Sequence, residues 1–232
     1  MNRKNIVITG GNRGIGNGLL KIFSEKHNVI ITVRNKEKGE QAIEGLKSLG
    51  NILDYVVMDV DSNEMILNGR EEIKEKLGHV DLLINNAGII GLRDGFGTLD
   101  YSAWAGAMDT NVFGPMRIAE ALIENVVESD LKQMVFITSR MGSITETHPN
   151  AYVYRSSKAA LNMAVRCMSL ELADKGITAI LFHPGHVQTD MGGATAPVTP
   201  KASIAGMKEQ IINFTQKNNG AFLSYDGGSI PW

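Results

Sequence analysis

Tyr154 and Lys158 are the two residues of this sequence whose types and spacing first suggest chemistry. Residues four apart on a helix lie on one face, one turn from each other. A free phenol has a pKa of about 10, and an ammonium beside it favours the phenolate, so a neighbouring lysine lowers that pKa. Bringing the pKa near 7 needs roughly 4 kcal/mol of preferential stabilisation. We expect Tyr154 to act as a proton donor; a half-buried tyrosine beside a solvated lysine is the alternative.

A glycine-rich turn near the start of the chain predicts a phosphate site. Residues 5–9 are the short, apolar, β-branched run of a buried parallel strand, and a helical apolar pattern follows residue 16. Glycines between a strand and a helix let the backbone approach a phosphate, which the N-terminus of the helix attracts. A plain tight turn is the alternative. The candidate residues are Gly10, Asn12, Arg13, Gly14, Ile15 and Gly16.

The end of the second predicted strand, residues 29–33, indicates which dinucleotide fits. An acid at this position hydrogen-bonds the ribose 2′-hydroxyl of NAD, whereas an arginine accommodates the 2′-phosphate of NADP. The sequence has Arg34 there, and Arg13 lies in the glycine-rich turn. Two cations without an acid favour NADP(H), with two solvated surface arginines as the alternative.

Strands and helices alternate along the chain, and this alternation must position these residues. The predicted strands are 5–9, 29–33, 53–58, 80–84, 133–138, 177–182 and 221–224, and the helices after the first are 36–49, 64–77, 108–127, 152–173 and 202–217. This order predicts an α/β protein: a single-domain Rossmann fold over 1–232, with a doubly wound parallel sheet of about seven strands flanked by helices. Residues 190–217 are typical of a substrate loop followed by a small helix.

Three local features of these elements carry further expectations. Asn35 is the predicted N-cap of the helix at 36–49, and Gly50 is its predicted C′ residue. In the stripe at 108–127, Pro115 removes a backbone donor four residues after Asn111, so we expect a local distortion there. Gly18, inside the first helix, costs about 1 kcal/mol relative to alanine, and the sequence gives no reason for it.

Composition argues against several kinds of partner. A net charge of −2 supplies no basic field for nucleic acid or anionic lipid, and the apolar runs are too short to span a bilayer. The single cysteine, Cys167, cannot form an internal disulfide, and the first residues do not resemble a signal peptide. No cluster of His, Cys or acidic residues has metal-ligand spacing. We therefore expect a cytoplasmic protein without a metal, a nucleic acid partner or a membrane partner.

The helix at 152–173 is apolar around most of its circumference. A sheet covers only one face of a helix, so the remaining apolar surface needs another partner. We expect a homodimer or homotetramer formed through the helices at about 108–127 and 152–173.

The chain resembles the short-chain dehydrogenase/reductase family over essentially its whole length. The matching elements, in the family's order, are Thr9-Gly10-x-x-x-Gly14-Ile15-Gly16, Asn85-Asn86-Ala87-Gly88, Asn111, Ser139, Tyr154-x-x-x-Lys158 and Pro184-Gly185. The stretch from His183 to Gly193 and the ending at Tyr225-Asp226-Gly227 are most similar to the sniffer-type carbonyl reductases and the bacterial C-factor proteins.

The resemblance implies a role for each matched residue. Tyr154 would give a proton to the substrate oxygen as hydride leaves the nicotinamide, and Ser139 would orient that oxygen. Lys158 would hold the nicotinamide ribose and lower the pKa of Tyr154, and Asn111 would hold a water that links Lys158 to solvent. The implied cofactor is NADP(H). Its contacts would be the turn from Gly10 to Gly16, Arg13 and Arg34 at the 2′-phosphate, Asp59 and Val60 at the adenine, Asn86 at the ribose with Ala87 and Gly88 beside it, and Pro184, Gly185, Val187 and Thr189, of which Val187 and Thr189 face the carboxamide.

The function predicted first is NADPH-dependent reduction of an aldehyde or ketone. A second hypothesis is an NADP(H)-binding regulatory or signalling protein of the C-factor type, whose catalysis is incidental. A third, a sugar-nucleotide epimerase or dehydratase, is disfavoured because only about forty residues follow Thr189, too few for a substrate domain. Specificity is expected to lie in the loops around Gly91, Met141 and Met191.

Overall fold

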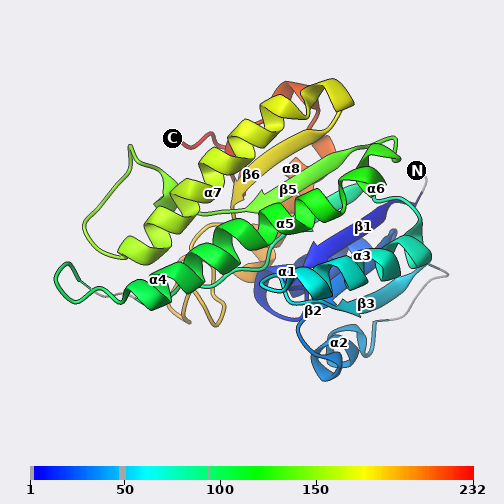
Figure 1. Ribbon diagram of the computed structural model, residues 1–232, viewed down its shortest axis with the longest axis horizontal. Coiled ribbons are helices and arrows are strands. Elements are labelled where there is room, and N and C mark those ends of the chain that lie inside the picture. The colour runs from blue at the N-terminus through cyan, green and yellow to red at the C-terminus, as the bar shows by residue number, and fades with distance from the viewer. Residues whose placement is uncertain (1–2, 47–50, 93–94) are drawn as a thin grey trace.

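Seven short, mainly apolar runs form one parallel sheet, buried on both faces by helices. The computed structural model describes residues 3–46, 51–92 and 95–232. The strand order is β3-β2-β1-β4-β5-β6-β7, and every neighbouring pair is parallel (Figure 1). The strands are β1 (Asn5–Thr9), β2 (Asn28–Val33), β3 (Leu53–Val57), β4 (Leu82–Asn85), β5 (Gln133–Ile137), β6 (Thr178–His183) and β7 (Phe222–Ser224). The predicted doubly wound sheet is confirmed.

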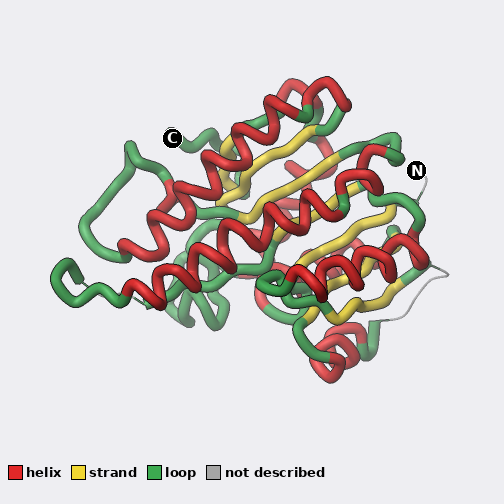
Figure 2. Tube along the Cα trace, in the orientation of Figure 1, coloured by secondary structure: helices red, strands yellow, loops and turns green. Residues whose placement is uncertain are grey.

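Helices cover both faces of the sheet, as the tube view shows (Figure 2). One core joins the sheet to α3 (Asn63–Leu77), α5 (Gly114–Ala121) and α7 (Tyr152–Glu171). The other core joins it to α1 (Gly14–Ser24), α2 (Lys36–Ile43) and α8 (Pro200–Asn213). The remaining helical elements are α4 (Tyr101–Met108), α6 (Ile123–Val127), a π-helix (Asp109–Phe113) and 3-10 turns at Arg140–Gly142, Ala173–Lys175 and Gln216–Asn218.

Three predicted helices have other limits than expected, and one of them, predicted at 202–217, is α8 at Pro200–Asn213. The helix predicted at 36–49 ends at Ile43; residues 47–49 and the predicted C′ residue Gly50 lie outside the described residues. Asn35 is its N-cap, as predicted, since its side chain accepts from the Lys38 amide at 3.0 Å. The stretch predicted from residue 108 becomes helical at Tyr101, because the side chain of Asp100 caps α4 by accepting from the Ala103 amide.

The expected distortion near Asn111 is confirmed. Residues Asp109–Phe113 form a π-helix between α4 and α5, and Pro115 follows directly in the first turn of α5. Proline has no N–H to give to the carbonyl of Asn111, so the ordinary α-helical pairing cannot continue across this point. The distortion therefore lies at a residue that the sequence assigns to the site.

The structure gives a reason for Gly18. α8 packs across α1 so closely that a Cβ at Gly18 would lie 1.8 Å from Cδ1 of Ile204. The glycine's low helix propensity is thus the cost of bringing the two helices together on one face of the sheet.

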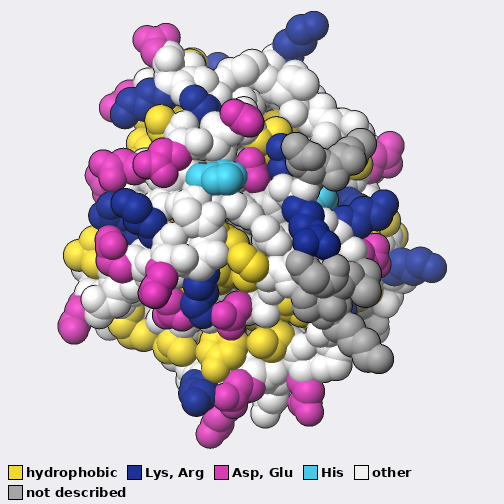
Figure 3. Space-filling view, turned by 90° about the vertical axis from the view of Figure 1, so that its right-hand side faces the viewer, with side chains coloured by type: hydrophobic (Ala, Val, Ile, Leu, Met, Phe, Trp, Pro, Cys, Tyr) yellow, Lys and Arg dark blue, Asp and Glu magenta, His cyan; other side chains and the backbone are white. Residues whose placement is uncertain are grey.

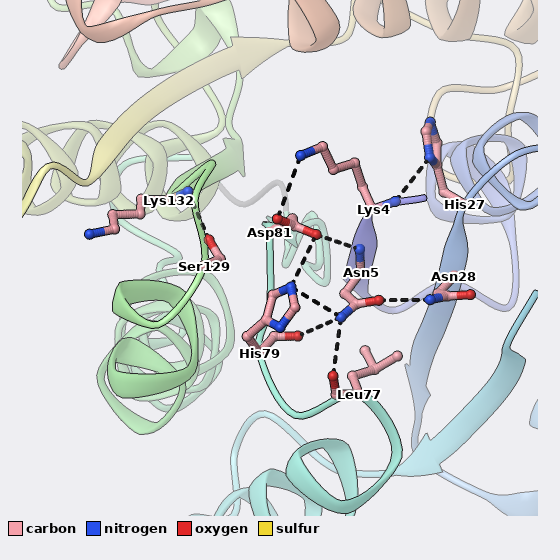
Figure 4. A network of polar contacts seen from close by, with 9 residues as sticks. All are labelled: Lys4, Asn5, His27, Asn28, Leu77, His79, Asp81, Ser129 and Lys132. Carbon is pink, nitrogen blue, oxygen red and sulfur yellow. Dashed lines mark hydrogen bonds and ion pairs between the residues drawn. The ribbon is translucent and has the colours of Figure 1, made fainter. Parts of the chain in front are cut away.

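The amino ends of the strands are joined by a network of polar contacts around Asp81 (Figure 4). Its buried carboxylate accepts from the backbone amide of Asn5 at 2.8 Å and lies 3.9 Å from the ammonium of Lys4 and 3.6 Å from Nε2 of His79. The side chain of Asn28 donates to that of Asn5 at 2.8 Å, which adds β2 to the network. On this side of the molecule basic and acidic side chains are interspersed (Figure 3).

In the described ranges of the chain, no helix combines the length and the apolar character that crossing a membrane requires.

Candidate active site

A cavity of about 1050 Å³ opens at the carboxyl ends of β1 and β4. These neighbouring strands are where the strand order reverses, the usual position for a ligand in an open parallel sheet. Most of the predicted cofactor residues line the cavity, namely Gly10, Asn12, Arg13, Gly14, Ile15, Arg34, Asp59, Val60, Asn86, Ala87, Gly88, Tyr154, Lys158, Pro184 and Thr189. The structure therefore gathers residues from six separate segments of the sequence in one place.

Three predicted cofactor residues do not line this cavity: Gly16, Gly185 and Val187. A Cβ at Gly16 would lie 2.5 Å from the side-chain nitrogen of Asn86 and from the carbonyl oxygen of Gly10, so Gly16 lets the turn close on β4. Gly185 has a φ of +88°, and Val187 is buried in a bridge to Val198. In this structure all three shape the backbone behind the cavity wall.

The glycine-rich turn has the form of an anion cradle. Gly10 and Gly14 have φ of +64° and +53°, a conformation that favours glycine. Arg13 occupies the N-cap position of α1 without a side-chain cap bond, and the first turn of α1 contains no acid. The leading N–H groups of α1 therefore face the cavity without a capping side chain, which suits the phosphates of a dinucleotide.

More cations line the cavity than the sequence analysis named. Lys21 of α1 and Lys38 of α2 join Arg13 and Arg34 there. Lys38 stands three residues after the cap Asn35, and this position on the first turn of the helix is the signal that could have identified it. Arg13 also forms an exposed ion pair, 3.3 Å from the carboxylate of Asp190. Among the described residues, the acids that line the cavity are Glu44, Asp59, Asp61, Asp109 and Asp190.

Ser139 lies two residues after the end of β5 at Ile137 and is the N-cap of the 3-10 turn Arg140–Gly142. Its Oγ accepts from the Met141 amide at 3.1 Å, and its carbonyl accepts from the Gly142 amide at 2.8 Å. Because one lone pair of the hydroxyl is occupied by a donor within its own turn, its proton is free to point outward. A hydrogen bond between the side chains of Ser139 and Tyr154 acts to lower the pKa of Tyr154.

Lys158 lies one turn after Tyr154 on α7, and its ammonium is 5.8 Å from the centre of the Tyr154 ring. The ammonium donates to the carbonyl oxygen of Ile137 at 3.0 Å, and burial lowers the pKa of Lys158 to about 8. Burial raises the pKa of Tyr154 to about 12, and this effect outweighs the opposing bond to Ser139. The expected lowering of the Tyr154 pKa by Lys158 is not seen here: burial is the larger effect on both groups, and it raises the pKa of Tyr154.

Asn111 is fully buried, and its side-chain amide is engaged on both sides. Its Oδ1 accepts from the Ile89 amide at 2.8 Å, while Nδ2 donates to the Ile89 carbonyl at 2.8 Å and to Oγ of Ser157 at 3.0 Å. A Cβ at Gly88 would lie 3.1 Å from Oδ1 of Asn111 and 3.6 Å from Nζ of Lys158. Asn111 thus joins the loop after β4 to α7, directly beside the lysine.

The wall of the cavity near Tyr154 is mainly apolar and small. It includes Ile89, Gly91, Leu92 and Met191, together with Ala103 and Gly106 of α4. Figure 1 shows α4 reaching the same end of the molecule as the start of α7. Gly91 and Met191 lie in loops, as predicted, but α4 is not predicted from the sequence; the capping residue Asp100 is the signal that could have revealed it.

Comparison with known proteins agrees with this geometry. The sequence profile of the short chain dehydrogenase family matches residues 4–198, and the chain belongs to this family.

Three similar proteins narrow the comparison. The C-signal protein of Myxococcus xanthus is 44% identical over 156 residues, which cover 67% of this chain and 94% of that protein. The NADPH-bound carbonyl reductase from chicken fatty liver has a TM-score of 0.90 and 30% identity, and the match covers 100% of both chains. The carbonyl reductase Sniffer of Drosophila melanogaster has a TM-score of 0.90 and 29% identity, also over 100% of both chains.

Proposed function

We propose that this oxidoreductase reduces an aldehyde or a ketone with NADPH and that Tyr154 gives the proton to the substrate oxygen. The observation that carries the proposal is that Tyr154 and Lys158 line the same cavity as the anion cradle, and that Ser139, which is not among the lining residues, is hydrogen-bonded to Tyr154. A proton donor, a partner for the substrate oxygen and a cofactor cleft are the parts that carbonyl reduction needs.

The residues at the other end of the cavity fit NADP(H). The turn around Gly10 and Gly14 and the uncapped start of α1 would hold the phosphates, and Arg13, Arg34, Lys21 and Lys38 offer positive charge for a 2′-phosphate. The chicken carbonyl reductase, similar over its whole length, is described as NADPH-bound. Bound in this cavity, NADPH supplies the hydride.

The proton chemistry belongs to this chain's own residues. With a pKa raised to about 12, Tyr154 keeps its proton at neutral pH and holds it ready for a developing alkoxide. Ser139 accepts from the Met141 amide within its own turn, which leaves its O–H available to donate to the substrate oxygen. Lys158 would hold the nicotinamide ribose. Both N–H groups of the Asn111 side-chain amide are already engaged. A proton relay through Asn111 would therefore use an oxygen, such as its backbone carbonyl, which receives no α-helical hydrogen bond because Pro115 has no N–H.

The test is Tyr154→Phe, which removes the hydroxyl and keeps the ring. We expect NADPH oxidation against a panel of aldehydes and ketones to fall at least about 100-fold, in the range of a lost general acid. The dissociation constant for NADPH, measured by fluorescence, should change little. Tyr152→Phe, two residues earlier and outside the cavity lining, is the matched control and should keep its turnover. Unchanged turnover in Tyr154→Phe would refute the assignment.

The similarity to C-signal favours a second candidate, an NADP(H)-binding signalling protein. The same assay separates the two candidates. Tight NADPH binding with no turnover on any carbonyl compound would favour the signalling protein, whereas turnover that depends on Tyr154 favours the reductase.

We also propose the assembly and the setting in which the enzyme works. α7 exposes Met163 and Leu170 with 64% and 62% of their surface, and Phe113 beside α5 is 50% exposed. These side chains support a homodimer or homotetramer through the helices at about 108–127 and 152–173. The proposed enzyme is a single cytoplasmic domain whose segment 190–217 shapes the substrate side, with a small carbonyl or alcohol compound as its partner.

A further inference from the structure

Asn162 continues the row of residues on α7 that begins with Tyr154 and Lys158. The three side chains are four residues apart, so they lie on one face of the helix, one turn after another. Asn162 is only 2% exposed, and among the described residues that line the cavity it does not appear. It is therefore a buried polar residue next to the site that touches neither of the proposed ligands.

The side-chain amide of Asn162 forms hydrogen bonds with a residue before Ser139 in the sequence and with a residue after it. The hydroxyl of Thr138, the residue before Ser139, donates to Oδ1 of Asn162 at 2.6 Å. Nδ2 of Asn162 donates to the carbonyl of Gly142, the last residue of the Ser139 turn, at 3.3 Å. Only a side chain that both accepts and donates can make this pair of bonds, which is what an amide offers.

Packing makes the attachment rigid. A Cβ at Gly142 would lie 2.8 Å from the carbonyl carbon of Lys158, 2.9 Å from Nδ2 of Asn162 and 3.0 Å from the amide nitrogen of Ala159. The backbone of the turn thus rests directly on α7, between the lysine and the asparagine. Any shift of this turn moves Ser139 relative to Tyr154.

We propose that Asn162 is a positioning residue that fixes Ser139 at hydrogen-bond distance from Tyr154 for catalysis. This inference rests on the proposed function, since it presumes that both hydroxyls contact the substrate oxygen. Displacing a reacting group by about 1 Å can cost on the order of 100-fold in rate. Loss of Asn162 should therefore lower kcat, while binding of NADPH, which other elements provide, changes little.

The experiment compares Asn162→Leu with Asn125→Leu. Asn125 of α6 is a matched control: it too is 2% exposed, and its Nδ2 donates to a glycine carbonyl, that of Gly78, at 2.8 Å. Both variants should be less stable, because Asn162→Leu leaves the carbonyl of the buried Gly142 and the hydroxyl of Thr138 without their partner, and Asn125→Leu removes the donor to the carbonyl of Gly78. Only Asn162→Leu should lower kcat, by about tenfold or more, with the dissociation constant for NADPH within about threefold of wild type.

Two further readouts separate positioning from general destabilisation. In a Ser139→Ala background, Asn162→Leu should cost little more, because Asn162 acts through Ser139. Hydrogen exchange of the Met141 and Gly142 amides should speed up in Asn162→Leu and not in Asn125→Leu.

The proposal is overturned by an unchanged kcat in Asn162→Leu, by losses that simply add to those of Ser139→Ala, or by unchanged amide exchange in the turn. A wild-type protein that reduces no carbonyl compound overturns the proposed function and, with it, the catalytic role of Asn162. In that case amide exchange still decides whether Asn162 holds the turn, so the two failures are distinguishable.

Discussion

Lys158 places an ammonium in a largely buried position at the wall of the cavity. The side chain belongs to a residue only 5% exposed, and its positive charge is held by one carbonyl oxygen, that of Ile137. Such a group makes the folded state less stable than an apolar residue of similar size would. The site thus sacrifices stability to keep a cation beside Tyr154, as expected where function and stability conflict.

We predict that Lys158→Met is more stable than wild type at pH 7 by about 2 kcal/mol. The pKa falls from 10.5 in the unfolded chain to about 8 in the folded protein, which corresponds to a cost of about 3 kcal/mol, less about 1 for the lost bond to Ile137. Below pH 8 the cost is fully present, and it fades between pH 8 and 10.5 because the folded protein releases its proton first.

Denaturant unfolding at pH 7, 9 and 10 measures this difference, which should shrink as the pH rises. Lys76→Met is the control with the opposite sign: partial burial acts to lower the pKa of Lys76, but the hydrogen bonds that its ammonium donates to Asp54 and Glu72 raise it overall. The K76M variant should be less stable than wild type at pH 7. A Lys158→Met variant that is less stable at pH 7 would contradict the argument.

At the scale of elements, the start of α1 and the end of β2 form the corner that we propose discriminates between NADPH and NADH. Arg34 follows β2 directly and lines the cavity, while Lys36, two residues later, pairs with Glu40 across one turn of α2. An arginine at the end of this strand accommodates a 2′-phosphate, whereas an acid there repels it and accepts from a 2′-hydroxyl.

Arg34→Asp should raise KM for NADPH by at least about tenfold while leaving KM for NADH unchanged or lower. Lys36→Asp makes the same change of charge outside the cavity and should alter both values little. Initial rates with the two cofactors measure the effect. Equal losses with NADPH and NADH in Arg34→Asp would remove the argument for NADP specificity.

The contact between α1 and α8 gives a prediction about packing. Gly18→Ala should destabilise the protein by about 1–2 kcal/mol despite alanine's better helix propensity, because the new methyl meets Ile204. Ile204→Val, which removes the Cδ1 atom, should recover part of that loss in the double variant. Gly106→Ala in α4, where a Cβ would meet nothing within 4 Å, should instead be neutral or stabilising. Midpoints of chemical unfolding decide; a stabilised Gly18→Ala would show that Ile204 simply moves aside.

Periodicity predicted the elements better than it predicted their environment. The strands were predictable because short β-branched apolar runs such as 29–33 are typical of buried strands. The site was predictable because the spaced glycines and the Tyr154–Lys158 pair lie at the ends of elements. The raised pKa of Tyr154 was not predictable, because the burial that causes it results from packing between segments far apart in sequence. Asn162 was missed for the same reason: its partners, Thr138 and Gly142, lie 24 and 20 residues away.

At the scale of the whole molecule, the exposed apolar stripe on α7 is the main unexplained surface. Met163, Cys167 and Leu170 recur at helical spacing on the side turned away from the sheet. Burying two such side chains contributes roughly 1.5–3 kcal/mol each, which is enough to make an association depend on them.

We predict that wild-type protein sediments as a dimer or tetramer at micromolar concentration and that Leu170→Glu shifts it towards monomer. A carboxylate in the centre of an apolar contact would have to be desolvated without a partner. Leu67→Glu is the matched control, since Leu67 on α3 is 55% exposed but lies on a different helix. Sedimentation velocity of the three proteins provides the test; a monomeric wild type would refute the proposed assembly.

The order of the strands also bears on how the protein is made. As synthesis proceeds, β1, β2 and β3 can pair as soon as residue 57 has emerged, but the other edge of β1 has no neighbour until β4 is complete at Asn85. A growing chain stopped between these points carries a Val- and Ile-rich strand with free N–H and C=O groups along one side, a template for unwanted association. Arrest of translation in this window should therefore give a nascent chain that depends on chaperones, and arrest after residue 85 one that depends on them less.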